Sequence, residues 1–241
     1  MSEIARLSVE IDDVTPRVVR LVEVPADIRL DDLHFVLQIA IGWQNGHPFE
    51  FRIGDKVWGQ PDRDADVSPT PAERATLSDI LAHGDAFKYD YVFGEDWQHT
   101  VTLLARAGAQ PVLRYPNLVS AEGRCPPADI GGPVGYETYL RSIADPNSVD
   151  HEGMLDFDAP DFDPHVVDTA TLRKNLAELS RYIGRKPSTR HPEVAAQRPN
   201  QVGAADLDLE NPKSGKPDFG RGDGLGASAV SFEARSARTS G

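Results

Sequence analysis

The chain has 241 residues, of which 25 are Lys or Arg, 38 are Asp or Glu and one is Cys, so its formal net charge is −13. This length allows a hydrophobic core without covalent staples, and one cysteine can form neither an intrachain disulfide nor a thiolate-rich zinc site. The acidic balance disfavours non-specific binding of phosphate backbones by the whole surface. The sequence shows no secretory signal pattern and no apolar run of about 20 residues, so we expect a cytoplasmic location and no membrane association.

Charge and composition divide the chain near residue 185. Residues 186–241 carry 8 Lys or Arg and 7 Asp or Glu, which leaves a formal charge of −14 on residues 1–185. The same segment contains 12 Gly or Pro and no Trp, Tyr, Met, Ile or Cys, so it cannot bury enough apolar surface to offset the entropy of ordering. We therefore expect an acidic domain over 1–185 and a disordered tail over 186–241.

The first elements predicted are a β-hairpin and a buried helix. Residues 7–11 alternate between apolar and polar, and Pro16 separates them from a second strand-like run over 17–24. A helix follows over about 30–42, with acidic residues in its first turn, where they suit the helix dipole. Apolar side chains cover most of its circumference, so we expect it to be largely buried, with one narrow polar strip formed by Asp31, His34, Gln38 and Gly42.

The next segment is predicted to be a strand, a long loop and a short helix. Residues 49–53 alternate again and indicate a strand, whereas residues 54–75 are polar and rich in Pro, which favours a loop. Thr76 and Asp79 have the spacing of a capping box, with Asp in place of the usual Glu or Gln. A short helix is therefore expected to begin after Thr76.

The strongest strand signals lie in the middle of the chain. Residues 87–93 place four aromatic side chains on one face, with Lys88 and Asp90 on the other. Residues 97–103 place Trp, His, Val and Leu on one face in the same way. The Gly-containing connection over 94–96 predicts that these two strands form an antiparallel hairpin.

Helices are predicted to close the domain. Residues 111–135 contain five Pro and four Gly and are expected to form a loop, followed by a helix over 136–144. A terminal helix is predicted to begin at a cap, Asp168 or Thr169, and to stop at Gly184. One apolar stripe runs along it, formed by Leu172, Leu176, Leu179 and Ile183. Strands and helices in this order predict an α+β domain.

Known catalytic motifs give little support for an enzyme. The chain has no phosphate-binding glycine motif after a strand, no Gly-x-Ser-x-Gly elbow and no His-Glu-x-x-His. Cys125 precedes two prolines and lacks the neighbouring base that a catalytic thiolate needs. His99 shares the apolar face of its strand, so we interpret it as a core histidine, with His34 at the edge of the core. We expect neither a cofactor nor a metal site.

Four sequence blocks carry a family resemblance. They are Leu33-His34-x-Val-Leu-Gln38 with Gly42-Trp43-x-Asn-x-His47, then Tyr89-Asp-Tyr-Val-Phe-Gly-Glu-Asp-Trp97-Gln-His99, then Cys125-Pro-Pro-Ala-Asp129-Ile-Gly-Gly132-x-x-Gly-Tyr136, and finally Ala144-Asp-Pro146 with His151-Glu152. In order and spacing, they resemble the plasmid open-reading-frame-three-like family, named from a root-inducing plasmid, over about residues 3–180. The resemblance implies an α+β fold and a bacterial, mobile-element setting.

The resemblance supplies no catalytic residues, because the family has no established biochemical activity. Members are often labelled passenger resolvase-like proteins of insertion sequences. A serine recombinase requires a nucleophilic Ser supported by arginines and a basic helix-turn-helix, whereas this domain is acidic and shows no such helix pair. The chain also departs from the family at Asn117 and Ile130, which are often Cys in relatives, and at Ala128, which replaces an acid. These departures weaken any metal or redox role.

Three functional hypotheses remain open at this point. The first is a noncatalytic module that binds an unknown protein or small molecule through the family motif residues Trp43, His47, Glu95, Asp96, Trp97, His99, Asp129 and Tyr136. The second is a metal-assisted hydrolase, in which His47, Asp96, His99 and Asp129 would converge. The third is a DNA-associated accessory protein that uses the basic residues Arg173, Lys174, Arg181, Arg185, Lys186 and Arg190 of the terminal helix and tail.

Overall fold

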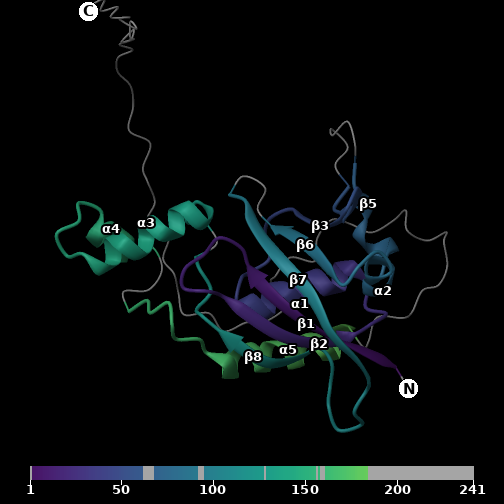
Figure 1. The fold of residues 1–241 in the computed structure, drawn as a ribbon. Helices are drawn as coiled ribbons and strands as arrows, with labels where there is room; N and C mark the ends of the chain where they lie inside the picture. Colours follow the sequence, from purple (N-terminus) through teal and green to yellow (C-terminus); the bar gives the residue numbers. More distant parts are fainter. Residues whose placement is uncertain are drawn as a thin grey trace, which may run out of the picture. The chain divides into compact units, whose positions relative to one another are not determined.

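The computed structural model describes residues 2–61, 68–91, 95–127, 129–155, 157 and 161–183. Its strands are β1 (Glu3–Ile11), β2 (Val19–Pro25), β3 (Phe49–Ile53), β4 (Lys56–Gly59), β5 (Thr70–Pro71), β6 (Ala86–Tyr91), β7 (Trp97–Gly108) and β8 (Asn117–Glu122). They form one eight-stranded sheet in the order β5-β4-β3-β6-β7-β1-β2-β8 (Figure 1). Only β4 and β5 pair in parallel among the described strands; the other neighbours are antiparallel.

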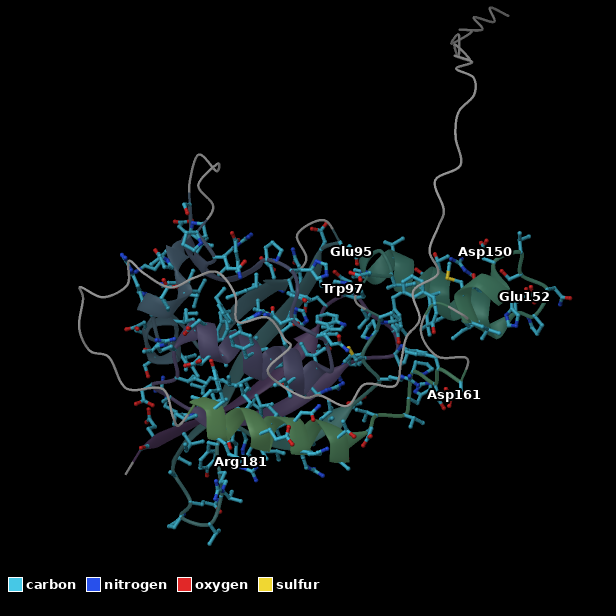
Figure 2. The ribbon with its side chains drawn as sticks, turned by 180° about the vertical axis from the view of Figure 1, so that it is seen from behind. Glu95, Trp97, Asp150, Glu152, Asp161 and Arg181 are labelled. Atoms are coloured by element: carbon cyan, nitrogen blue, oxygen red, sulfur yellow. The ribbon has the colours of Figure 1, made fainter. Side chains whose placement is uncertain are left out.

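The helices are α1 (Leu30–Ile41), α2 (Leu77–Leu81), α3 (Gly132–Ala144), α4 (His151–Leu155) and α5 (Thr169–Ile183), with a 3-10 turn, η1, over Ala72–Arg74. Helix α1 packs on the face of the sheet that carries Val9, Tyr89 and Val101, which are all buried. Helix α5 packs against both α1 and β8 and lies on the same face of the sheet as α1 (Figures 1 and 2). These observations confirm the α+β fold class.

The two predicted hairpins are confirmed by their registers. Strands β1 and β2 pair with Leu7 opposite Val22, and β6 and β7 pair with Tyr89 opposite His99. Strand β7 also pairs with β1, so the two hairpins join into the centre of the sheet. The positions predicted for residues 92–94 lie outside the described residues.

Helix α1 is buried as predicted, with ten of its twelve residues inaccessible to solvent. It ends at Gly42, whose φ of 116° lies in the left-handed region and whose N–H donates to the Gln38 carbonyl. The predicted polar strip is not exposed, because His34 and Gln38 are both buried beneath the loops that follow α1 and hydrogen-bond to Tyr89. The predicted polar strip is therefore partly buried, and His34 lies deeper than the edge of the core where it was expected.

Two predicted loops contain regular structure. Residues 54–75 include β4, β5 and η1, because the tight turn at Gly54 and Asp55 returns β4 antiparallel beside β3. Residues 111–135 include β8, which pairs with the edge of β2. Prolines and glycines flank these short strands, so the composition of the wider windows concealed them.

The starts of α2 and α5 follow the predicted capping chemistry, whereas the predicted stop at Gly184 lies outside the described residues. Thr76 and Asp79 form a reciprocal capping box at the start of α2. The Asp168 carboxylate accepts from the N–H groups of Ala170 and Thr171, so Asp168 caps α5. Helix α3 begins one turn earlier than predicted. None of the described helices is long and apolar enough to cross a membrane. The expected tail, residues 186–241, lies outside the described residues.

Candidate functional site

Three loops carrying the family motifs meet at one end of the sheet. The Trp43 indole N–H donates to the Pro126 carbonyl at 2.7 Å, which joins the loop after α1 to the loop before α3. The His47 ring nitrogen Nε2 lies 3.1 Å from the Asp129 carboxylate and forms a second link between these loops. We call the described part of these connections, residues 43–48, 95–96, 124–127 and 129–132, the motif rim.

Glu95 joins the third loop to the N-terminus of α3. Its carboxylate oxygen Oε2 accepts from the backbone N–H groups of Gly131 and Gly132 at 3.2 and 3.3 Å, and Glu95 and Trp97 lie beside this end of the helix in Figure 2. A carboxylate at this position satisfies unpaired N–H groups and complements the helix dipole. Gly132 has a φ of 68°, and a Cβ there would lie 1.9 Å from the Glu95 carbonyl oxygen, so only glycine fits this approach.

Buried aromatic rings pack between the motif rim and the core of the domain. Trp43 packs at 5.3 Å, centroid to centroid, against Tyr91, Trp97 and His99. Of the eight candidate residues, Trp43, Trp97, His99 and Tyr136 are buried. Trp97 and His99 face the buried side of β7, and Tyr136 faces inward from α3. Trp43, in the loop after α1, packs against the same aromatic cluster. These four therefore belong to the core and leave four candidates for a binding surface.

The other four candidates have access to solvent. His47 and Glu95 are partly buried, while Asp96 and Asp129 are exposed. Asp96 has a φ of 54° in the turn before β7, a left-handed conformation that Asp adopts more readily than most residues. The contact between His47 and Asp129 is itself solvent-exposed, so we expect it to orient the loops more than to stabilise the fold.

His99 is a core histidine, as predicted. Its Nδ1 lies 2.9 Å from the Tyr89 carbonyl oxygen and donates to it, and burial lowers the pKa of the ring to about 4. The ring is therefore neutral at pH 7, and the residue is fully buried. Within the described residues, no three His, Cys, Asp or Glu side chains are grouped so as to hold a metal ion. The described residues thus offer no ligand set for the hydrolase hypothesis.

The DNA hypothesis rested on basic residues of α5 and the tail. Arg173 donates to the carbonyl oxygens of Leu118 and Val119 at 3.2 Å, so it fixes α5 against β8. Lys174 and Arg181 are exposed on α5, where Figure 2 labels Arg181. The remaining residues of that hypothesis, Arg185, Lys186 and Arg190, lie outside the described residues.

A buried hydrogen-bond chain beneath the motif rim was not predicted. Gln38 donates to the Tyr89 hydroxyl at 2.9 Å, and that hydroxyl donates to Nδ1 of His34 at 2.7 Å. Nε2 of His34 lies 2.8 Å from Oδ1 of Asn45 in the motif rim and carries the proton of the ring. Burial lowers the pKa of His34 to about 4, so the chain is uncharged. Polar residues four apart on a buried helix were the signal for it in the sequence.

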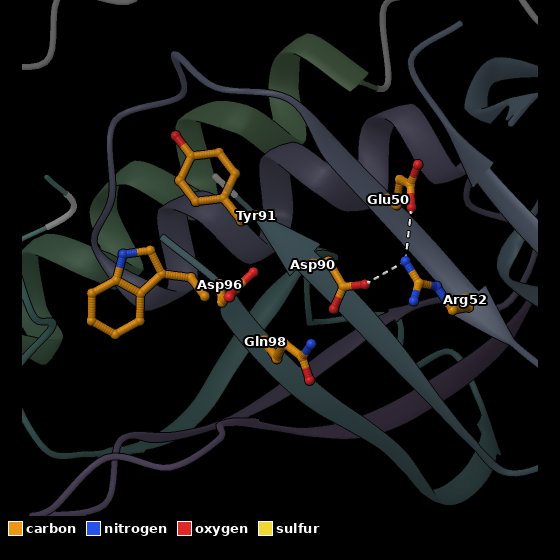
Figure 3. A pocket seen from close by; sticks show the side chains of 7 residues that line it. Glu50, Arg52, Asp90, Tyr91, Asp96 and Gln98 are labelled. Atoms are coloured by element: carbon orange, nitrogen blue, oxygen red, sulfur yellow. Dashed lines mark hydrogen bonds and ion pairs between the residues drawn. The ribbon is translucent and has the colours of Figure 1, made fainter. Parts of the chain in front are cut away.

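A polar pocket on the opposite face of the sheet also escaped sequence analysis. It has a volume of about 300 Å³ and is lined by Glu50, Arg52, Asp90, Tyr91, Asp96, Trp97 and Gln98 (Figure 3). The strand alternation correctly placed Asp90 away from the aromatic face. It did not show that the Asp90 carboxylate is almost completely buried, because this depends on the neighbouring strands.

Comparison with known proteins identifies relatives without a described activity. The chain is 37% identical over 189 residues to the uncharacterized protein y4hQ of Sinorhizobium fredii (strain NBRC 101917 / NGR234), covering 77% of this chain and 97% of that protein. The crystal structure of a protein of unknown function, MM3350 from Methanosarcina mazei Go1, is similar with a TM-score of 0.64 and 27% identity, covering 73% of this chain and 98% of that one. The family model for plasmid pRiA4b ORF-3-like proteins matches residues 3–171. The chain therefore belongs to the plasmid pRiA4b ORF-3-like family.

Proposed function

We propose that this protein is a noncatalytic binding module and that its ligand or partner contacts the exposed side of the motif rim. The observation that carries the proposal is the convergence of three motif-bearing loops, far apart in sequence, through hydrogen bonds and a shared aromatic base. Loops held in this way present side chains in fixed positions, which reduces the entropy lost on binding. The contact residues in this proposal are His47, Glu95, Asp96 and Asp129.

The chemistry of the nearby groups supports binding over catalysis. His34 and His99 are buried and neutral, so neither is placed to exchange a proton with a molecule at the surface. The Glu95 carboxylate is engaged by the N-terminus of α3. Neither alternative, the metal-assisted hydrolase or the DNA-associated protein, has a comparable observation in its favour. A bacterial mobile-element setting, which the family description suggests, forms part of the proposal.

A position-specific crosslinking experiment tests this function. A photoreactive amino acid would replace Asp129 in the motif rim, with Glu137, an exposed acid on α3, as the matched control position. Both variants would be expressed in a bacterium that naturally carries the gene, irradiated and analysed by mass spectrometry. We expect an adduct of one defined mass at Asp129 and none at Glu137, with the captured molecule chemically unaltered. Equal capture at both positions, no capture at either, or a captured reaction product would contradict the proposal.

A further inference from the structure

The pocket in Figure 3 lies on the face of the sheet that α1 does not cover. Glu50, Asp90 and Gln98 stand directly opposite one another across β3, β6 and β7. Two carboxylates in directly opposed positions repel each other and are unfavourable in a sheet. Arg52 bridges them, because its Nη2 lies 3.0 Å from Glu50 Oε2 and 3.2 Å from Asp90 Oδ2.

Asp90 remains incompletely satisfied despite this bridge. The residue is 8% exposed, and within the described residues its Oδ1 atom is buried without a hydrogen-bond partner. Lys88, the lysine of β6, donates to Asp12 at 2.7 Å and to Thr100 at 2.9 Å. Burial raises the pKa of Asp90 above its ordinary value, because removal from water disfavours the charged carboxylate. A ligand that donates a hydrogen bond to Asp90 Oδ1 would remove the cost of burying this acceptor without a partner.

The charges of the residues that line the pocket favour a positively charged ligand. Glu50, Asp90 and Asp96 contribute three carboxylates and Arg52 one guanidinium, so the lining carries a formal charge of −2. The volume, about 300 Å³, is at the lower end of the range for small-molecule sites. An anion would be repelled, and a divalent metal would lack a grouped ligand set among the described residues.

We propose that this pocket binds a small organic cation with N–H donors, a primary ammonium or a guanidinium, which donates to Asp90 Oδ1. Asp96, at the edge of the pocket, would contribute a second favourable charge. Gln98 lies beside Asp90 in Figure 3 and is exposed, so its side chain can turn aside at little cost as the cation enters. Because the pocket shares Asp96 with the motif rim, this inference rests on the proposed function and names a ligand class for it.

Titration of the full chain with simple cations tests the inference. The probes are n-butylammonium and ethylguanidinium, monitored by amide chemical shifts, with 1-butanol as an uncharged control and tetramethylammonium as a cation that lacks N–H donors. We expect both probes to shift amides of β3, β6 and β7, and both controls to leave them unchanged. Equal shifts with the controls, or shifts confined to other elements, would overturn the proposal.

Two variants assign the binding to Asp90. Asp90→Asn removes the charge and should weaken both probes by about tenfold or more, the loss expected for a hydrogen bond to a charged group. Asp55→Asn makes the same chemical change at an exposed turn outside the pocket and should leave affinity unchanged. Unchanged affinity in a folded Asp90→Asn variant would refute the assignment.

Gln98→Lys keeps the test valid if Asp90→Asn does not fold. It tethers an ammonium group opposite Asp90, so we expect a higher melting temperature and loss of probe binding. A lower melting temperature together with retained binding would contradict the proposal. The two proposals can fail separately. If the cations do not bind but the photoreactive group at position 129 still gives its specific adduct, only the cation site is refuted. If the cations bind but no adduct forms, only the proposed function of the motif rim is refuted.

Discussion

Arg20 is a buried cation whose removal should destabilise the whole fold. Its guanidinium donates to the carbonyl oxygens of Ala40 at 2.6 Å, Ile41 at 2.9 Å, Val19 at 2.9 Å and Glu122 at 2.7 Å. Two of these acceptors are at the C-terminal end of α1, where a positive charge also complements the helix dipole. Burial lowers the pKa of Arg20, but an arginine stays protonated at neutral pH.

Arg20→Met retains most of the side-chain length and removes every donor. Each of the four carbonyl acceptors that Arg20 satisfies would cost about 1–3 kcal/mol if it were left buried without a donor. Part of this total cost is offset, because the substitution also removes a desolvated positive charge. We therefore expect a loss of about 3–5 kcal/mol in the free energy of unfolding, in the range typical for breaking a buried charged network. The loop that follows α1 should loosen as well, because Arg20 fixes the carbonyls that precede Gly42.

Urea denaturation followed by tryptophan fluorescence measures the first effect, and amide hydrogen exchange over residues 43–48 measures the second. Arg17→Met is the matched control, because Arg17 is exposed and pairs only with Glu10 among the described residues. This control should shift the denaturation midpoint far less. A loss smaller than about 1 kcal/mol for Arg20→Met, or equal losses in the two variants, would refute the reasoning.

Two further predictions concern the motif rim and its aromatic base. Gly132→Ala places a Cβ against the Glu95 carbonyl at a positive φ, so we expect destabilisation by about 1–3 kcal/mol in thermal unfolding. Gly153→Ala, where a Cβ meets nothing within 4 Å, should be neutral or slightly stabilising, and equal effects would contradict the contact. Burial lowers the pKa of His99 from 6.5 to about 4, so between these pH values the unfolded chain binds more protons than the folded one. The free energy of unfolding therefore falls as the pH drops from 6.5 to 4, and His99 accounts for at most about 3 kcal/mol of that loss. His99→Phe should therefore reduce this loss between pH 6.5 and 4 relative to wild type, whereas the exposed control His83→Phe should not; identical pH profiles for wild type and His99→Phe would argue against a buried neutral ring.

Local sequence patterns predicted most of the regular elements, because their causes are local. The alternation over 7–11 and 87–91 follows from the period of a strand, and the apolar stripe of α5 follows from the period of a helix. The capping box at Thr76 was recognisable for the same reason. Strands β4 and β8 were missed because each is stabilised by a neighbouring strand rather than by its own pattern.

The candidate site was predictable only in part. The motif residues were identified as one candidate set, but their spacing could not show that His47, Glu95 and Asp129 contact neighbouring loops at one end of the sheet. The sequence could not separate the exposed members from the buried ones, because an aromatic residue at a loop suits either environment. Trp43 and Trp97 proved to be buried support for the loops.

The sequence by itself determined the fold class, the family and the acidic charge of residues 1–185, because these depend on short-range order, recognisable motifs and composition. The burial of His99 could be predicted from its strand pattern, but only the tertiary structure decided what the buried polar groups contact and that Asp90 is among them. Arg20 lies on the same face of β2 as the buried Val22 and Val24, but only the structure shows that the end of α1 covers it and supplies its acceptors. Asp90 follows the polar side of β6, and its burial arises from Glu50, Arg52 and Gln98 on the neighbouring strands. Burial of a charge depends on partners distant in sequence, and no local pattern specifies them.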